Sequence, residues 1–179
     1  MTSTERLRRV LLVCCNFGRN MAHYRAGWVG QHQALLTKGF WRNVNGNCMD
    51  HCVLEWCKLF GDFRDKHHWQ NVVSSPKHFE TSLLNSLGTS PIDFEHEIRV
   101  FRRYRDKFVA HLDSERTMSI PTLDLAFESV AFYHAHITTH EVDLFALEGL
   151  PLDFRRGYQE EMADAIKVYD WASRQIFKT

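Results

Sequence analysis

The sequence predicts an all-α fold, a single helical bundle of about five to six helices that spans residues 1–179. Three observations lead to this prediction. Long stretches repeat apolar residues with the 3.6-residue period of an amphipathic helix, and no segment shows the two-residue alternation of an exposed strand. Only four prolines and nine glycines interrupt the chain. No repeat, linker or low-complexity segment divides it, and its length suits one domain with a substantial core rather than two.

The N-terminal part of the chain predicts two helical regions. The first runs from about residue 4 to residue 37, with a break near Gly27 or Gly30. The stretch "KGFWRNVNGN" (38–47) is rich in glycine and asparagine and is predicted to be a loop. A helix from about 48 to 60 follows it.

The middle of the chain predicts an irregular segment and then two helices that begin with similar signals. "GDFRDKHHWQNVVSS" (61–75) shows no regular pattern. A short helix at about 76–87 has Ser75 as its N-cap and a proline at its first position. Ser90 and the next proline begin a longer helix in the same way, and its periodicity continues to about residue 112.

Two further helices complete the predicted bundle. They run from about 122 to 142 and from about 154 to 177. The segments "DSERTMSIP" (113–121) and "LEGLPL" (147–152) connect them to the rest of the chain as loops.

The 92–112 helix carries an arginine where its pattern calls for an apolar residue. Five apolar residues share a sector about 80° wide and predict a core-facing stripe: Phe94, Ile98, Phe101, Phe108 and Leu112. Arg105 falls inside this sector, and His111 lies roughly 60° beyond one edge of it. Burying an unpaired charge is very costly, so the arginine needs a carboxylate from another helix, an exit to solvent, or a function.

The stretch "RDKFVAH" (105–111) matches an arginine, a polar residue, four further positions and a histidine. It resembles the R-x(4–6)-H signature of the HEPN superfamily, whose members are mostly helical bundles. The trailing "AHLD" (110–113) resembles the abortive-infection-type branch. The stretches "LEWCKLFGD" (54–62), "HHW" (67–69) and "SIPTLD" (119–124) are similar in character to that branch. The resemblance covers most of the chain, but one short motif carries the chemistry.

The resemblance implies a metal-independent endoribonuclease of a bacterial toxin or phage-defence type that acts as a homodimer. In that mechanism His111 would transfer the proton at the RNA 2′-hydroxyl or the leaving oxygen, because its reference pKa of about 6.5 suits the task. Arg105 would hold the scissile phosphate and stabilise the charge that develops on it. Asp106 would orient one of these side chains.

The same resemblance also leaves a different class of function open. Some superfamily members lack activity, so the alternative is a catalytically inactive HEPN module that binds RNA or a protein partner. An antitoxin protein is an expected partner of the nuclease. Some toxins of this superfamily carry a modifiable tyrosine two residues after the histidine, and here that position is Asp113.

Four further cations accompany the motif on the same helix. Arg99, Arg102, Arg103 and Lys107 lie within nine residues. They are interpreted either as an RNA-backbone patch beside the site or as a solvated helix face that pairs with neighbouring acids.

Two residue clusters raise a metal-binding alternative, a small helical metalloprotein. His136 and His140 are four residues apart, a spacing that can hold zinc, but no third ligand is evident. The cysteines near residues 48–57 lack the paired spacing of zinc knuckles and are interpreted as small buried side chains. No metal and no cofactor is expected.

Composition limits the partners and the compartment. The 22 basic residues balance the 22 acidic residues, so no global field attracts a polyanion or an anionic membrane. The apolar run at 10–15 is far shorter than the roughly 20 residues of a membrane span. With five cysteines and no secretory segment, we expect a cytoplasmic protein with reduced thiols.

Overall fold

The computed structural model describes residues 3–109, 120–141 and 149–177. The described residues form helices, turns and connecting segments without a β-strand, which confirms the all-α prediction. None of the described helices combines the length and the apolar character that a bilayer-spanning helix requires.

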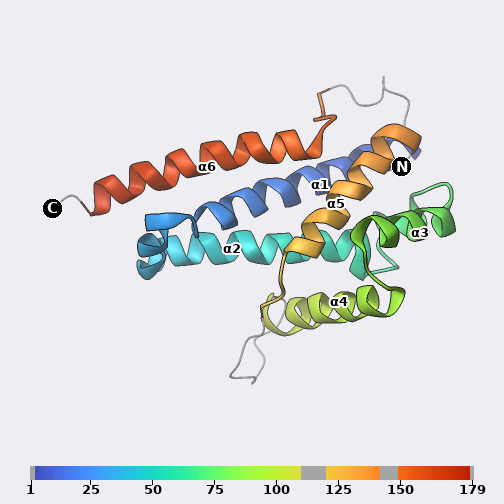
Figure 1. The fold of residues 1–179 in the computed structure, drawn as a ribbon, viewed down its shortest axis with the longest axis horizontal. Helices are drawn as coiled ribbons and strands as arrows, with labels where there is room; N and C mark the ends of the chain where they lie inside the picture. The colour runs from blue at the N-terminus through green and yellow to red at the C-terminus, as the bar shows by residue number, and fades with distance from the viewer. Residues whose placement is uncertain (1–2, 110–119, 142–148, 178–179) are drawn as a thin grey trace.

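Figure 1 shows three long helices lying side by side, with α1 (Ser3–Ala26) between α2 (Gly39–Trp56) and α6 (Phe154–Ile176). The helix α5 (Asp124–His136) crosses α1 and packs against α3 (Pro76–Leu87). The helix α4 (Pro91–Tyr104) lies against the C-terminal end of α2, on the outer side of the bundle. The predicted helices at 76–87, 91–112, 122–142 and 154–177 are thus confirmed over their described residues.

The core below α4 is built from aromatic rings around Trp56. The Trp56 ring centroid lies 4.3 Å from that of Phe101 and 5.4 Å from that of Phe60. The indole Nε1–H of Trp56 donates a buried hydrogen bond of 2.8 Å to the hydroxyl of Ser129 on α5. Burial of rings of this size contributes strongly to the stability of the bundle, and the hydrogen bond satisfies the one polar atom of the indole.

Among the described elements, three helices continue into single π-helical turns, a rare geometry that is frequent at functional sites. The turn η2 (Cys57–Gly61) extends α2, η4 (Arg105–Val109) extends α4, and η5 (Ile137–Glu141) extends α5. No sequence pattern predicted these turns. In a π turn the backbone hydrogen bonds span five residues instead of four. The 3.6-residue period used to place residues after position 104 therefore does not hold there.

The predicted loop at 38–47 is wrong, because α2 already begins at Gly39. Long-range contacts explain the helix despite its glycines and asparagines. Asn45 is buried and its Nδ2 donates a hydrogen bond of 2.8 Å to the Tyr24 carbonyl on α1. The ring centroid of Trp41 lies 5.3 Å from that of Tyr169 on α6. Tertiary packing therefore overrides the weak local propensity of this segment.

The predicted break in the first helical region is confirmed. The helix α1 ends at Ala26, and the 3₁₀ helix η1 (Gly30–Thr37) follows it. A Cβ atom at Gly27 would lie only 2.5 Å from Nδ2 of Asn45, so the close approach of α2 requires glycine there. Gly30 has a φ angle of +51°, which glycine adopts without strain.

The segment 61–75 is irregular, as predicted, apart from the short 3₁₀ turn η3 (Trp69–Asn71). At the start of α4 the predicted cap is present, because the Ser90 side chain accepts a hydrogen bond from the Asp93 N–H. Ser75 occupies the N-cap position of α3, but its side chain makes no capping hydrogen bond.

Candidate functional site

The apolar face of α4 is directed into the bundle, as the periodicity predicts. Phe94 and Phe101 are buried, and Ile98 is half-buried against the same core. Tyr104 is also buried, and its hydroxyl donates a hydrogen bond of 2.8 Å to Oδ1 of Asp50 on α2. These contacts fix the rotation of α4 about its axis and thereby the direction of the residues that follow.

Arg105 is the first residue of the π turn η4 and lies at the edge of the predicted stripe. Its side chain is 21% exposed, and its Nε–H donates a hydrogen bond of 2.8 Å to Oδ1 of Asp106. Burial lowers the pKa of Arg105, but the hydrogen bond and the negative charges of Asp106 and Asp62 together raise it above its ordinary value. The structure thus brings Arg105 and Asp106 together and holds a charged guanidinium at the protein surface.

His111, the other half of the motif, lies outside the described residues, as does Leu112. The geometry of the candidate site is therefore built from Arg105, Asp106 and the elements that pack beside them. One of these elements is the turn η2 at the end of α2, which packs against α4.

The π turns η2 and η4 flank one another. Cys57 of η2 is buried, and burial raises the pKa of its thiol to about 12, so the thiol stays protonated and is a poor nucleophile. A Cβ atom at Gly61 would lie 3.3 Å from Sγ of Cys57 and 3.5 Å from Cγ of Arg102. The side-chain stem of Arg102, one helical turn before Arg105, therefore packs beside Gly61 of η2.

The four cations predicted to bind RNA lie on the same part of α4 and η4. Arg99, Arg102 and Arg103 are exposed, and Lys107 is half-buried. Arg99 is 3.6 Å from Glu95 in a solvent-exposed ion pair, a contact worth little energy in water. Their exposure suits the predicted phosphate contacts, which remain a prediction.

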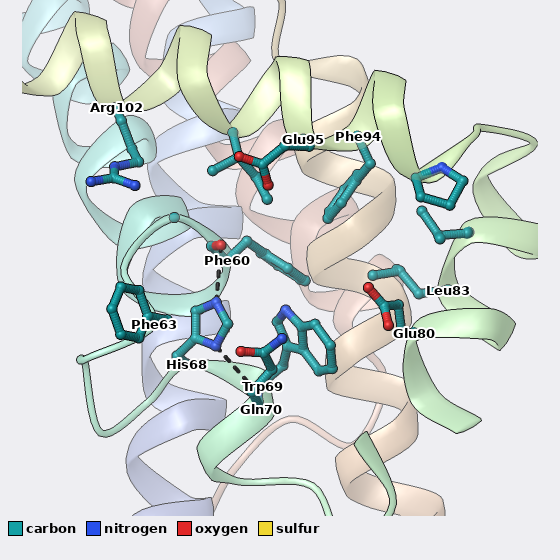
Figure 2. Close-up of a pocket in the computed structure, with 14 residues that line it drawn as sticks. Phe60, Phe63, His68, Trp69, Gln70, Glu80, Leu83, Phe94, Glu95 and Arg102 are labelled. Carbon is teal, nitrogen blue, oxygen red and sulfur yellow. Dashed lines mark hydrogen bonds between the residues drawn. The ribbon is translucent and has the colours of Figure 1, made fainter. Parts of the chain in front are cut away.

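A cleft of about 220 Å³ opens beside these cations, and the sequence did not predict it. Figure 2 shows that α3 and α4 form two of its sides and that the segment from Phe60 to Gln70 forms the third. Its floor is apolar and includes Phe60, Trp69 and Phe94. Its walls carry Glu80, Glu95, Gln70 and Arg102.

His68 lines the cleft but has a structural role. It is buried, and its Nε2 lies 3.0 Å from the Phe60 carbonyl while its Nδ1 accepts from the Gln70 N–H at 3.3 Å. Because the carbonyl can only accept and the N–H can only donate, these partners select the neutral ring with the proton on Nε2. Burial lowers the pKa of His68, which favours the same neutral form.

The histidines and cysteines outside the motif make contacts within the fold. His136 lies 3.1 Å from Oε1 of Glu141, and its ring centroid is 5.0 Å from that of His140. Of the three cysteines predicted to be small buried side chains, Cys52 and Cys57 are buried, as predicted, whereas Cys48 is only half-buried. Across residues 3–109, 120–141 and 149–177, no three histidine, cysteine, aspartate or glutamate side chains gather in a metal-binding arrangement.

Comparison with known proteins assigns no family to the chain. No protein-family model matches it, and neither a curated protein nor a solved structure matches it. The R-x(4–6)-H motif and the contacts around Arg105 are therefore the features that point to a function.

Proposed function

We propose that this protein is a metal-independent endoribonuclease of a bacterial toxin or phage-defence type, and that it acts as a homodimer through Arg105 and His111. The observation that carries the proposal is the environment of Arg105. Its guanidinium lies at the start of a π turn, is held by the adjacent Asp106 at 2.8 Å and has a raised pKa. Its described ion pair is with the neighbouring Asp106 rather than with a carboxylate of another helix, and its side chain keeps 21% of its surface exposed.

The proposed chemistry divides between the two motif residues. With its Nε engaged by Asp106, Arg105 directs its terminal N–H groups toward the scissile phosphate and stabilises the charge that develops on its oxygens. His111 accepts the proton of the 2′-hydroxyl as that oxygen attacks phosphorus. The P–O5′ bond breaks, the 5′ oxygen takes up a proton, and a 2′,3′-cyclic phosphate remains on the other fragment.

The dimer follows from the same residues. Two motif helices that face one another would line a wet cleft with two arginine–histidine pairs, which accommodates a cation at the edge of an apolar stripe. Arg99, Arg102, Arg103 and Lys107 would then contact the RNA backbone on either side of the scissile bond. Binding by such contacts weakens linearly with the logarithm of the salt concentration.

The test is cleavage of a fluorescently labelled single-stranded RNA in buffer that contains EDTA. We expect His111→Ala and Arg105→Ala each to lower the cleavage rate by about 10²–10⁴-fold, the usual contribution of acid–base or electrostatic catalysis. His96→Ala on the exposed surface of α4 and Arg9→Ala on α1 are matched controls and should cleave like the wild type. His136→Ala should also leave cleavage intact.

The same experiment can reject the proposal. Wild-type protein that cleaves no RNA, or a His111→Ala variant that cleaves as fast as the wild type, contradicts the nuclease. Cleavage that stops in EDTA and returns with magnesium or zinc contradicts the metal-independent mechanism. If the protein binds RNA or an antitoxin protein without cleaving RNA, the inactive HEPN module becomes the better description.

A further inference from the structure

The cleft beside η2 has opposite charges at its two ends and an apolar floor between them. Figure 2 shows Arg102 at one end, Glu80 at the other, and Glu95 on the α4 wall between them. Glu95 and Arg102 are seven residues apart and therefore share one face of α4, separated by about 10 Å along the axis. The buried rings of Phe60 and Phe94 lie between these polar groups.

The size of the cleft limits the ligand to one ring system. Its volume of about 220 Å³ lies below the roughly 300–1,000 Å³ of most small-molecule pockets. Phe63 extends the cleft at its rim, where its ring is 60% exposed and can stack on a planar ligand. The cleft therefore suits a flat ring that packs against the apolar floor.

The polar groups set the hydrogen-bonding pattern that the ligand must have. A carboxylate only accepts hydrogen bonds and a guanidinium only donates them. The ligand therefore needs donors at the edge near Glu95 and an anion at the end near Arg102. His68 contributes no further donor or acceptor, because both of its nitrogens are engaged within the fold.

We infer that this cleft binds one nucleobase of the RNA, with guanine preferred. Guanine places N1–H and the N2 amino group next to one another, so that both can donate to the Glu95 carboxylate. Its nucleotide carries a phosphate at the opposite end, where Arg102 lies. Uracil has a single ring donor between two carbonyl oxygens, and those oxygens repel a carboxylate.

This inference rests on the proposed ribonuclease function, because it assigns the bound base to a position along the substrate. Arg102 precedes Arg105 by three residues, which places both guanidinium groups on neighbouring turns of the same helix. A phosphate at Arg102 is then adjacent in the strand to a phosphate at Arg105. The cleft thus selects the nucleotide next to the cleaved bond and gives the enzyme a base preference.

The test measures binding of mononucleotides rather than cleavage. Guanosine, cytidine, adenosine and uridine monophosphates are titrated into the protein while the indole N–H signal of Trp69 is followed by NMR, with Trp69→Phe used to assign the signal. We expect guanosine monophosphate to shift this signal and to bind most tightly, and uridine monophosphate to bind most weakly. Glu95→Gln should weaken the binding of guanosine monophosphate by at least about fivefold, which is the lower end of the range for a good contact between a side chain and a base.

Glu97→Gln is the matched control, since it makes the same change of charge two residues along α4 without lining the cleft. It should bind guanosine monophosphate like the wild type. Because Glu95 is 56% exposed, its substitution should leave the melting temperature unchanged, which a thermal melt verifies. The wild-type titration tests the inference even without the variant.

The outcomes separate this inference from the proposed function. If no mononucleotide shifts the Trp69 signal while RNA is still cleaved, the base site is wrong and the nuclease stands. If guanosine monophosphate binds and Glu95→Gln weakens it but RNA is not cleaved, the base site stands and the nuclease falls. If N-acetylarginine amide shifts the signal and the nucleotides do not, the cleft takes a cation of a protein partner and the inference is overturned.

Discussion

Replacement of Arg105 by lysine separates the proposed catalytic role of this residue from a structural one. Arg105→Lys keeps the positive charge but removes the planar fork and the Nε–H that donates to Asp106 at 2.8 Å. The two side chains are 21% and 55% exposed, and exposed ion pairs contribute only about 0.2–1 kcal/mol to stability. For a chain of this size the melting temperature should therefore change by no more than about 4 °C.

The effect on cleavage should be much larger. Loss of one preorganised donor to a developing negative charge typically lowers the rate constant by about 10²–10³-fold. Single-turnover cleavage of labelled RNA measures this loss, and circular dichroism melts measure the stability of the same samples. Asp106→Asn should lower the rate less, because Asp106 positions the guanidinium without contacting the phosphate.

The double variant Arg105→Lys with Asp106→Asn makes the test more specific. If Asp106 acts only through the guanidinium of Arg105, its substitution should have no further effect once that guanidinium is gone. Additive losses would show that Asp106 acts independently. If Arg105→Lys cleaves RNA within a few-fold of the wild-type rate, Arg105 has no specific catalytic role. If the variant instead melts more than about 10 °C lower than the wild type, the role of Arg105 is structural. Either result would refute the proposed role.

Three further predictions concern the pH response, the dimer and the core. Burial lowers the pKa of His134 to about 4, so the unfolded chain takes up this proton at a higher pH than the folded chain does. Roughly 3 kcal/mol of stability should therefore be lost as the pH falls from 6.5 to 4. Denaturant titrations across this pH range should show a smaller loss of stability for His134→Leu. Ile92→Glu, at a position 78% exposed on α4, should shift the mass measured by light scattering from that of a dimer toward that of a monomer. Phe40→Glu, at a position 70% exposed at the start of α2, should leave the dimer mass unchanged. Equal masses for the wild type and both variants would contradict a dimer interface through Ile92 on α4. Ser129→Ala leaves the indole N–H of the central core tryptophan without its partner and should lower the stability measured in thermal melts by about 1–3 kcal/mol. The control Ser173→Ala removes a buried hydroxyl that has no partner among the described contacts and should not lower the stability. Equal effects of the two substitutions would contradict the role of the hydrogen bond.

The sequence alone determined the features that depend on local order. The 3.6-residue period places Phe94 and Phe101 on the buried face of α4, and the serine–proline signal places the start of that helix at residues 90–91. The adjacency of Arg105 and Asp106 is also local, so their contact could be anticipated from the motif. These features were predictable because they involve residues within a few positions of one another.

The helix at 39–47 shows where local reasoning fails. Its glycines and asparagines favour a turn, and contacts with the distant residues Tyr24 and Tyr169 stabilise the helix. The residues of the segment do not reveal those partners, because a helix propensity measures the preference of a residue without its tertiary neighbours. The π turns that extend α2 and α4 escape prediction for the same reason.

The cleft was decided by tertiary structure alone. Its lining comes from separate segments near residues 60–70, 80–84 and 91–102. The local sequence of each segment indicates only an ordinary amphipathic helix or an irregular connection. A periodic pattern shows which face of a helix is buried but not which element covers it or how closely. The packing of η2 against α4 helps to leave the space that brings Glu95 and Arg102 to one cleft, and only packing in three dimensions sets that space.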